Sequence, residues 1–143
     1  MDLTELILIL ATVDGETIRA QNHQGEVATI KLACIHIPTQ KSRRDQAFQR
    51  LKQLLAKNTP VVIRFADTYN DKILGEVFLD NQSINLQMVK EGKAVVDKLS
   101  VEQNCYESRI QFMVAFASAK QRGLGLWEKS RYVVGASKLA NYS

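Results

Sequence analysis

The alternation of apolar and polar residues divides the first part of the chain into short strands. The run from Leu6 to Ala11 is rich in strand-forming residues, and Asp14-Gly15 soon after it favours a tight reversal. Residues 18–22 and 27–35 continue as two further strands. Pro38 ends the third strand because proline lacks the N–H donor that a ladder needs. The pattern predicts a three-stranded meander.

Three later segments, near residues 42–57, 84–91 and 106–122, have the apolar spacing of amphipathic helices. The last of them is marked by apolar residues at i, i+3, i+4 and i+7, which are Ile110, Met113, Val114 and Ala117. We expect the stripe of Phe112, Met113 and Phe116 to be mostly core. Any member that faces outward would contact a partner.

Two more strands are predicted at residues 61–65 and 73–78. Three strands, a helix and two more strands, with helices behind them, is the order of a five-stranded OB-fold barrel. The sequence therefore predicts an OB-fold barrel with three helices over residues 1–128, followed by a C-terminal tail, residues 129–143.

Composition fits a single soluble domain, since 45% of the 143 residues are hydrophobic and 24% are charged. The net charge of +4 is compatible with a polyanionic partner but is common among globular domains. The longest apolar run is too short to cross a membrane, so we expect no membrane partner.

Cys34 and Cys105 lie far apart without metal-ligand spacing. They indicate neither a disulfide nor a zinc site, and we expect a reducing, cytoplasmic location.

Five segments resemble the thermonuclease, or staphylococcal-nuclease-like, family in order and spacing. They are VDGET (13–17), KLACIHIP (31–38), DTY (67–69), NLQMVKEGKA (85–94) and GLGLW (123–127). The resemblance covers about residues 6–128. It implies an OB barrel with three helices and hydrolysis of DNA or RNA phosphodiester bonds with a calcium ion.

The resemblance also assigns metal and catalytic roles to positions of this chain. Asp14 and Glu16 match the acidic turn that holds calcium, so a weak metal site could survive there. His36 stands where the family has its second metal-binding aspartate, and imidazole is a poor ligand for calcium. Thr39 replaces the glutamate that assists the attacking water. Losing a positioned base costs about 10²–10⁴-fold in rate.

The family's two phosphate-binding arginines are matched by lysines. Lys31 keeps the charge of the first but loses the planar fork that grips two oxygens. Lys72 is the nearest match to the second, although its approach is one residue longer than in the family. Tyr69 matches one ring that sandwiches a base, whereas residues 93–98 contain no ring. We therefore expect weakened nucleic-acid contacts from Lys31, Tyr69 and Lys72.

Other interpretations of the same residues remain open. Asp14 and Glu16 could serve only as turn residues. His36 could share a metal with Cys34 on one strand face, or act as the base of a metal-independent phosphodiesterase with Lys31 and Lys72. Trp127 is interpreted as a core anchor for the last helix.

Three functions follow from these patterns. The first is a catalytically impaired thermonuclease-like domain that binds nucleic acid or a protein partner. The second is an active metal-dependent nuclease that hydrolyses DNA or RNA. The third is a protein-interaction subunit with no nucleic-acid role. Because four of the five family roles are altered, we expect no resident cofactor. Calcium is the ion that the family resemblance implies.

Overall fold

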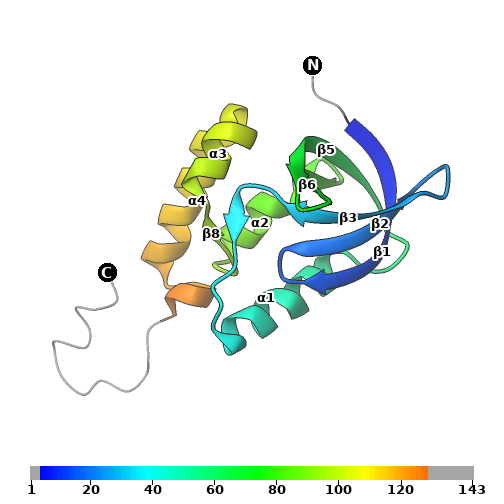
Figure 1. Cartoon of the computed structure of the whole chain (residues 1–143). Coiled ribbons are helices and arrows are strands. Elements are labelled where there is room, and N and C mark those ends of the chain that lie inside the picture. Colours follow the sequence, from blue (N-terminus) through cyan, green and yellow to red (C-terminus); the bar gives the residue numbers. More distant parts are fainter. Residues whose placement is uncertain (1–3, 129–143) are drawn as a thin grey trace, which may run out of the picture.

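The computed structural model describes residues 4–128, which form a β-barrel with helices below it and beside it in the view of Figure 1. The barrel strands are β1 (Thr4–Asp14), β2 (Thr17–Asn22), β3 (Val27–Leu32), β5 (Pro60–Tyr69) and β6 (Lys72–Leu79). Neighbours in the order β3-β2-β1-β5-β6 are antiparallel, and a parallel pairing of β3 with β6 closes the barrel. The predicted five-stranded barrel is confirmed. The predicted tail lies outside the described residues.

Within residues 4–128, four α-helices accompany the barrel, one more than predicted. They are α1 (Lys41–Leu54), α2 (Ile84–Lys90), α3 (Lys98–Asn104) and α4 (Arg109–Arg122), with 3-10 turns η1 (Tyr106–Ser108) and η2 (Gly125–Trp127). The unpredicted helix is α3. It is short, it buries only Val101, and its N-cap Asp97 accepts the Ser100 N–H. With one buried residue it has no apolar stripe that a periodicity analysis could detect.

The strand expected over residues 27–35 is in fact two strands. β3 ends at Leu32, and Cys34, with a φ of 74°, turns the chain away from the barrel. β4 (Ile35–His36) then pairs with β8 (Val95–Val96) in a separate two-stranded sheet. Cys34 and His36 therefore do not lie on one strand.

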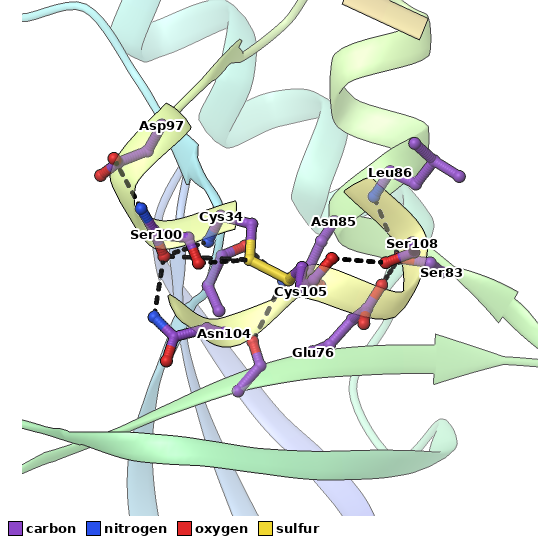
Figure 2. The surroundings of a disulfide bond; sticks show 12 residues. Cys34, Glu76, Ser83, Asn85, Leu86, Asp97, Ser100, Asn104, Cys105 and Ser108 are labelled. Atoms are coloured by element: carbon purple, nitrogen blue, oxygen red, sulfur yellow. Dashed lines mark hydrogen bonds between the residues drawn. A yellow bond between two sulfur atoms is a disulfide. The ribbon is translucent and has the colours of Figure 1, made fainter. Parts of the chain in front are cut away.

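The expectation of two unlinked cysteines is wrong. Cys34 and Cys105 form a disulfide that joins positions 71 residues apart, with Cα atoms 6.5 Å from each other (Figure 2). Both cysteines are buried. Because disulfides persist mainly in oxidising surroundings, the argument for a reducing compartment no longer holds. No helix within residues 4–128 is long and apolar enough to cross a bilayer.

The core fills the barrel and the layer between the barrel and the helices. One polar side chain, Asn85 of α2, is fully buried within it. Its Nδ2 donates to the carbonyls of Ala33, at 2.8 Å, and Gly75, at 3.1 Å. Its Oδ1 accepts the Val77 N–H at 3.0 Å. Asn85 thus ties α2 to the end of β3 and to β6.

Helix α4 buries the face opposite to the stripe that marked it in the sequence. Its buried residues are Phe112, Ala115 and Ala119. Met113, expected in the core, is exposed, while Phe116 is half-buried. Trp127 packs edge to face on Phe116, with ring centroids 5.7 Å apart, which supports its interpretation as an anchor.

Candidate functional site

A pocket of about 320 Å³ lies where the chain leaves the barrel after β3 and where α3 covers it. It brings together three of the predicted site residues, Lys31, His36 and Tyr69. Its other polar lining comes from α3 and its cap and comprises Asp97, Ser100, Gln103 and Asn104. Sequence reasoning missed these side chains because it did not predict α3. The sequence held one indication that a helix begins here: Asp97 is a residue type favoured at the N-cap, and it stands three positions before Ser100.

Lys31 and Glu16 form an ion pair at one side of this pocket. Thr17 and Lys31 are cross-strand partners, and the Glu16 carbonyl accepts the Leu32 N–H at 2.7 Å. This register places the Lys31 Nζ 3.3 Å from Oε2 of Glu16, with each side chain about one-fifth to one-quarter exposed. The Oε2 atom is buried and makes no hydrogen bond, so the contact is one of charge only. The carboxylate expected to bind a metal is therefore already faced by a cation.

Asp14 has a local role in the β1–β2 turn. Its Oδ1 accepts the Glu16 N–H at 2.9 Å, and the residue is exposed. Gly15 between them packs on α1, where an added Cβ would lie 2.6 Å from the Cβ of Ala47. This is the arrangement that the turn interpretation of Asp14 predicts.

The residues at the family's metal positions do not fit a calcium ion. Within residues 4–128, there is no group of three or more His, Cys, Asp or Glu side chains that could hold a metal ion. His36 is exposed on β4, and Thr39 is exposed in the bend before α1. Calcium takes six to eight oxygen ligands. The pairing of His36 with Cys34 is also ruled out, since Cys34 is in the disulfide.

The β5–β6 hairpin supplies the aromatic ring. Asn70 and Asp71 form its turn with φ values of 47° and 66°, the left-handed pair that a two-residue hairpin turn requires. This turn makes Tyr69 and Lys72 cross-strand partners. Tyr69 is 53% exposed and lines the pocket, whereas Lys72 does not line it. The extra residue before Lys72 is therefore taken up by the hairpin turn.

Helix α3 forms the opposite wall of the pocket and is fixed to the turn at Cys34 (Figure 2). The Ser100 hydroxyl accepts the Cys34 N–H at 2.9 Å and the Asn104 side-chain amide at 3.0 Å. The Asp97 N–H donates to the Cys34 carbonyl at 3.0 Å. Together with the disulfide, these contacts hold α3 beside the strand that carries Lys31.

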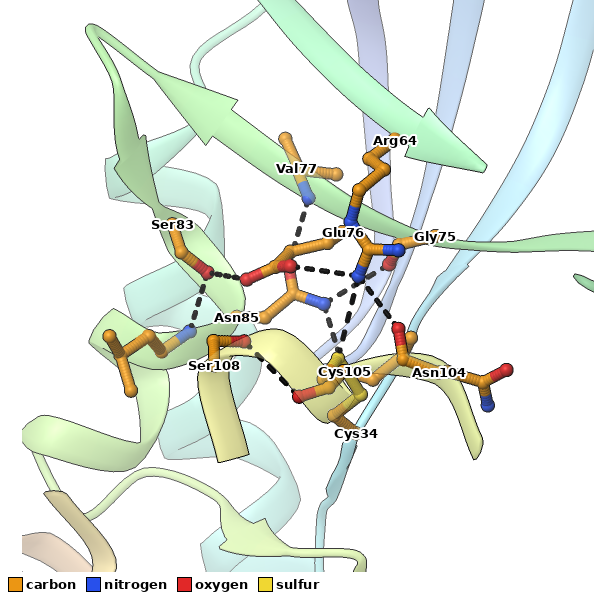
Figure 3. A network of polar contacts seen from close by, with 12 residues as sticks. Cys34, Arg64, Gly75, Glu76, Val77, Ser83, Asn85, Asn104, Cys105 and Ser108 are labelled. Atoms are coloured by element: carbon orange, nitrogen blue, oxygen red, sulfur yellow. Dashed lines mark hydrogen bonds and ion pairs between the residues drawn. A yellow bond between two sulfur atoms is a disulfide. The ribbon is translucent and has the colours of Figure 1, made fainter. Parts of the chain in front are cut away.

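A buried polar network supports the C-terminal end of α3 (Figure 3). The Arg64 Nη2 donates to Oε1 of Glu76 at 3.0 Å and to the Asn104 carbonyl at 2.8 Å. The Ser83 hydroxyl donates to the other Glu76 oxygen at 2.6 Å. Both carboxylate oxygens of this buried residue thus have donors, which offsets the cost of burying the charge. A larger cavity of about 560 Å³ borders this network, but it contains none of the predicted site residues.

Comparison with known proteins assigns the family. The family described as staphylococcal nuclease homologue matches residues 17–129, so the chain belongs to the staphylococcal nuclease family. A protein of Haemophilus influenzae named "Uncharacterized endonuclease" is 30% identical over 120 residues. That match covers 80% of this chain and 61% of the relative, so the chain spans about three-fifths of the relative's length. The predicted family is confirmed.

Proposed function

We propose that this chain is a catalytically impaired member of the staphylococcal nuclease family that binds nucleic acid at the pocket lined by Lys31, His36 and Tyr69. One observation carries the proposal: the Lys31 ammonium is paired with Glu16, the carboxylate that the family resemblance places in the metal-binding turn. A cation held there by the protein disfavours a second cation through like-charge repulsion.

The neighbouring positions also argue against calcium-dependent hydrolysis. His36 offers one imidazole, and Thr39 has no group that accepts a proton from water at neutral pH. Thr39 is also exposed in the bend outside the pocket lining. Among the described residues that line this pocket, the carboxylate is that of Asp97, whose Oδ1 accepts the Ser100 N–H as the N-cap of α3, so it serves the helix rather than the activation of a water molecule.

The pocket keeps features that suit a nucleotide. Lys31 provides a cation for a phosphate, and the exposed ring of Tyr69 provides a surface on which a base can stack. Stacking on one aromatic side chain contributes about 1–3 kcal/mol per base. With one ring and one already paired lysine, the expected affinity is low, and the single phosphate contact makes it fall modestly as salt rises.

Fluorescence anisotropy with labelled single-stranded DNA and RNA tests the binding half of the proposal. Affinity should fall as salt rises, and Tyr69→Ala should weaken it by about tenfold or more. Tyr106→Ala is the matched control, because Tyr106 is 52% exposed but lies on η1 and does not line this pocket. Binding that ignores salt, or equal losses in both variants, would overturn the proposed site.

A nuclease assay on plasmid DNA and RNA tests the catalytic half. We expect no degradation with calcium, magnesium or manganese beyond that seen with chelator. The alternative is an active metal-dependent endonuclease, which family membership and the name of the Haemophilus relative favour. Degradation that requires a metal and is abolished by Glu16→Ala would establish this alternative and refute catalytic impairment.

A further inference from the structure

Helix α4 presents an apolar stripe to solvent on the side away from the barrel core. Ile110 and Val114 are 63% and 62% exposed, and Met113 is 36% exposed. Ala117, one turn further along, is also exposed. We call these four residues the α4 stripe. Apolar residues that recur on one exposed helix face, rather than singly, are typical of an interaction site.

A groove runs beside the α4 stripe, between α4 and α2. Its volume is about 350 Å³, and Val114 belongs both to the stripe and to the groove. Leu86 and Ala115 add apolar lining, while Lys90 and Arg122 are its charged residues. No carboxylate lines the groove among the described residues. It therefore offers an apolar side chain a place to insert, next to two cations.

The charges on α4 have one sign. The helix carries Arg109, Lys120 and Arg122 and no acidic residue. Arg109 lies 3.9 Å from the centre of the Tyr106 ring, and Lys120 lies 5.2 Å from that of Trp127. Aromatic rings rather than carboxylates thus hold two of these cations beside the stripe, where they keep their capacity to pair with acids on another molecule.

This charge distribution disfavours two occupants that belong to the chain itself. Arg109 and Lys120 are about three helical turns apart and lie on the same side of the stripe. Antiparallel pairing with a second copy would bring one against the other. Residues 129–143 contain three lysines or arginines and no acid, so they would also add like charge.

We propose that the α4 stripe and its groove dock an amphipathic helix of a partner protein, with acidic residues beside its apolar ones. A helix in a groove is read through apolar anchors at i, i+3, i+4 and i+7. The acids would face Lys90 and Arg122 on one side and Arg109 and Lys120 on the other. A side-chain-sized groove and a stripe of four residues fit an inserted helix better than a flat lipid surface, which needs a broad apolar face.

Selection from a displayed peptide library tests the proposal with the full chain. The library holds helix-forming peptides of about the length of α4, with apolar residues varied on one face and Glu, Gln or Lys varied beside them. We expect selected peptides to be enriched in Glu. A synthesised winner should bind at least about tenfold less tightly to Val114→Asp and to Arg122→Glu.

Leu6→Asp is the matched control, because Leu6 is 63% exposed on β1, outside the α4 stripe and its groove. It should leave peptide affinity unchanged, and circular dichroism should show all three variants folded. Lack of enrichment, enrichment of Lys, or equal binding to Val114→Asp would overturn the proposal. So would self-association in sedimentation, or flotation with phosphatidylglycerol vesicles, if Val114→Asp abolished either.

Discussion

The Lys31 ammonium nitrogen lies 3.3 Å from Oε2 of Glu16, across the junction between β3 and the β1–β2 turn. The register of β2 and β3 fixes this approach, since Thr17, next to Glu16, is the cross-strand partner of Lys31. The pair places a positive and a negative charge side by side at the pocket. Each charge weakens the electrostatic attraction that the other exerts on a ligand.

Breaking the pair from its two ends should change oligonucleotide affinity in opposite directions. Lys31→Ala removes a phosphate contact and should weaken binding about fivefold, equivalent to about 1 kcal/mol. Glu16→Gln frees the lysine and should strengthen binding by a similar factor. Because both side chains are partly exposed, the free energy of unfolding should change by less than about 1 kcal/mol. Anisotropy titrations check this, and a change in the same direction for both variants would contradict it.

Restoring carboxylates at the family positions should create calcium affinity. The double variant His36→Asp with Thr39→Glu adds oxygen ligands to a site that now offers too few of them. We expect isothermal titration calorimetry with calcium chloride to detect binding to the double variant and none to the unaltered protein. His23→Asp with Thr4→Glu makes the same changes at other exposed positions and should show no calcium binding. Equal calcium binding by all three proteins would contradict the prediction.

The disulfide should contribute substantially to stability. It joins positions 71 residues apart, for which the loop-entropy account gives about 4 kcal/mol, and disulfides typically contribute about 2–4 kcal/mol. Urea unfolding should show a loss of this size for Cys34→Ser with Cys105→Ser, and for the unaltered protein in reductant. Reductant should leave the double serine variant unchanged. An unfolding curve of the unaltered protein that reductant does not shift would show that the bond is not formed.

Asn85→Leu should destabilise the protein by about 2 kcal/mol or more. The substitution leaves the Ala33 carbonyl and the Val77 N–H without partners, and each buried unpaired group costs about 1 kcal/mol or more. The Gly75 carbonyl loses one donor but still accepts the Ala33 N–H at 2.8 Å. Gln46→Leu, on the exposed face of α1, is the control and should change the free energy of unfolding by less than about 0.5 kcal/mol. A loss for Asn85→Leu no larger than that of the control would refute this role.

The ion pair between Arg50 of α1 and Glu91, which follows α2, should make stability depend on pH. Burial raises the pKa of Glu91, but hydrogen bonds from Arg50, at 2.6 and 2.8 Å, and from Gln87 outweigh burial and lower it from 4.5. A lowered folded-state pKa stabilises the fold above the unfolded pKa, and this stabilisation disappears as pH falls through the folded value.

Unfolding experiments between neutral pH and about pH 3 test this relation. Glu91→Gln should be less stable than the unaltered protein at neutral pH, and the difference should shrink as the pH falls below the unfolded pKa. Glu5→Gln, in which no buried pair is lost, should show no such convergence. A Glu91→Gln difference that is constant with pH would contradict the prediction.

Several residues show why the candidate site could be predicted only in part. Lys31 and Tyr69 were predicted from the family resemblance, through motifs that lie on regular strands, and both line the pocket. Lys72 was expected beside them, but the turn at Asn70 and Asp71 absorbs the extra residue. Ser100 and Asn104 belong to a helix with a single buried side chain, which leaves no periodic signal.

The sequence by itself determined where the five barrel strands occur along the chain and which family the chain belongs to. Alternation, turn residues and motif spacing are local properties of the chain. Tertiary structure decided which face of α4 is buried, since both faces carry apolar residues and only packing against α2 and β8 distinguishes them. It also decided that Cys34 meets Cys105 and that Lys31 meets Glu16. Contacts between residues distant in sequence depend on how the elements pack, which no local pattern encodes.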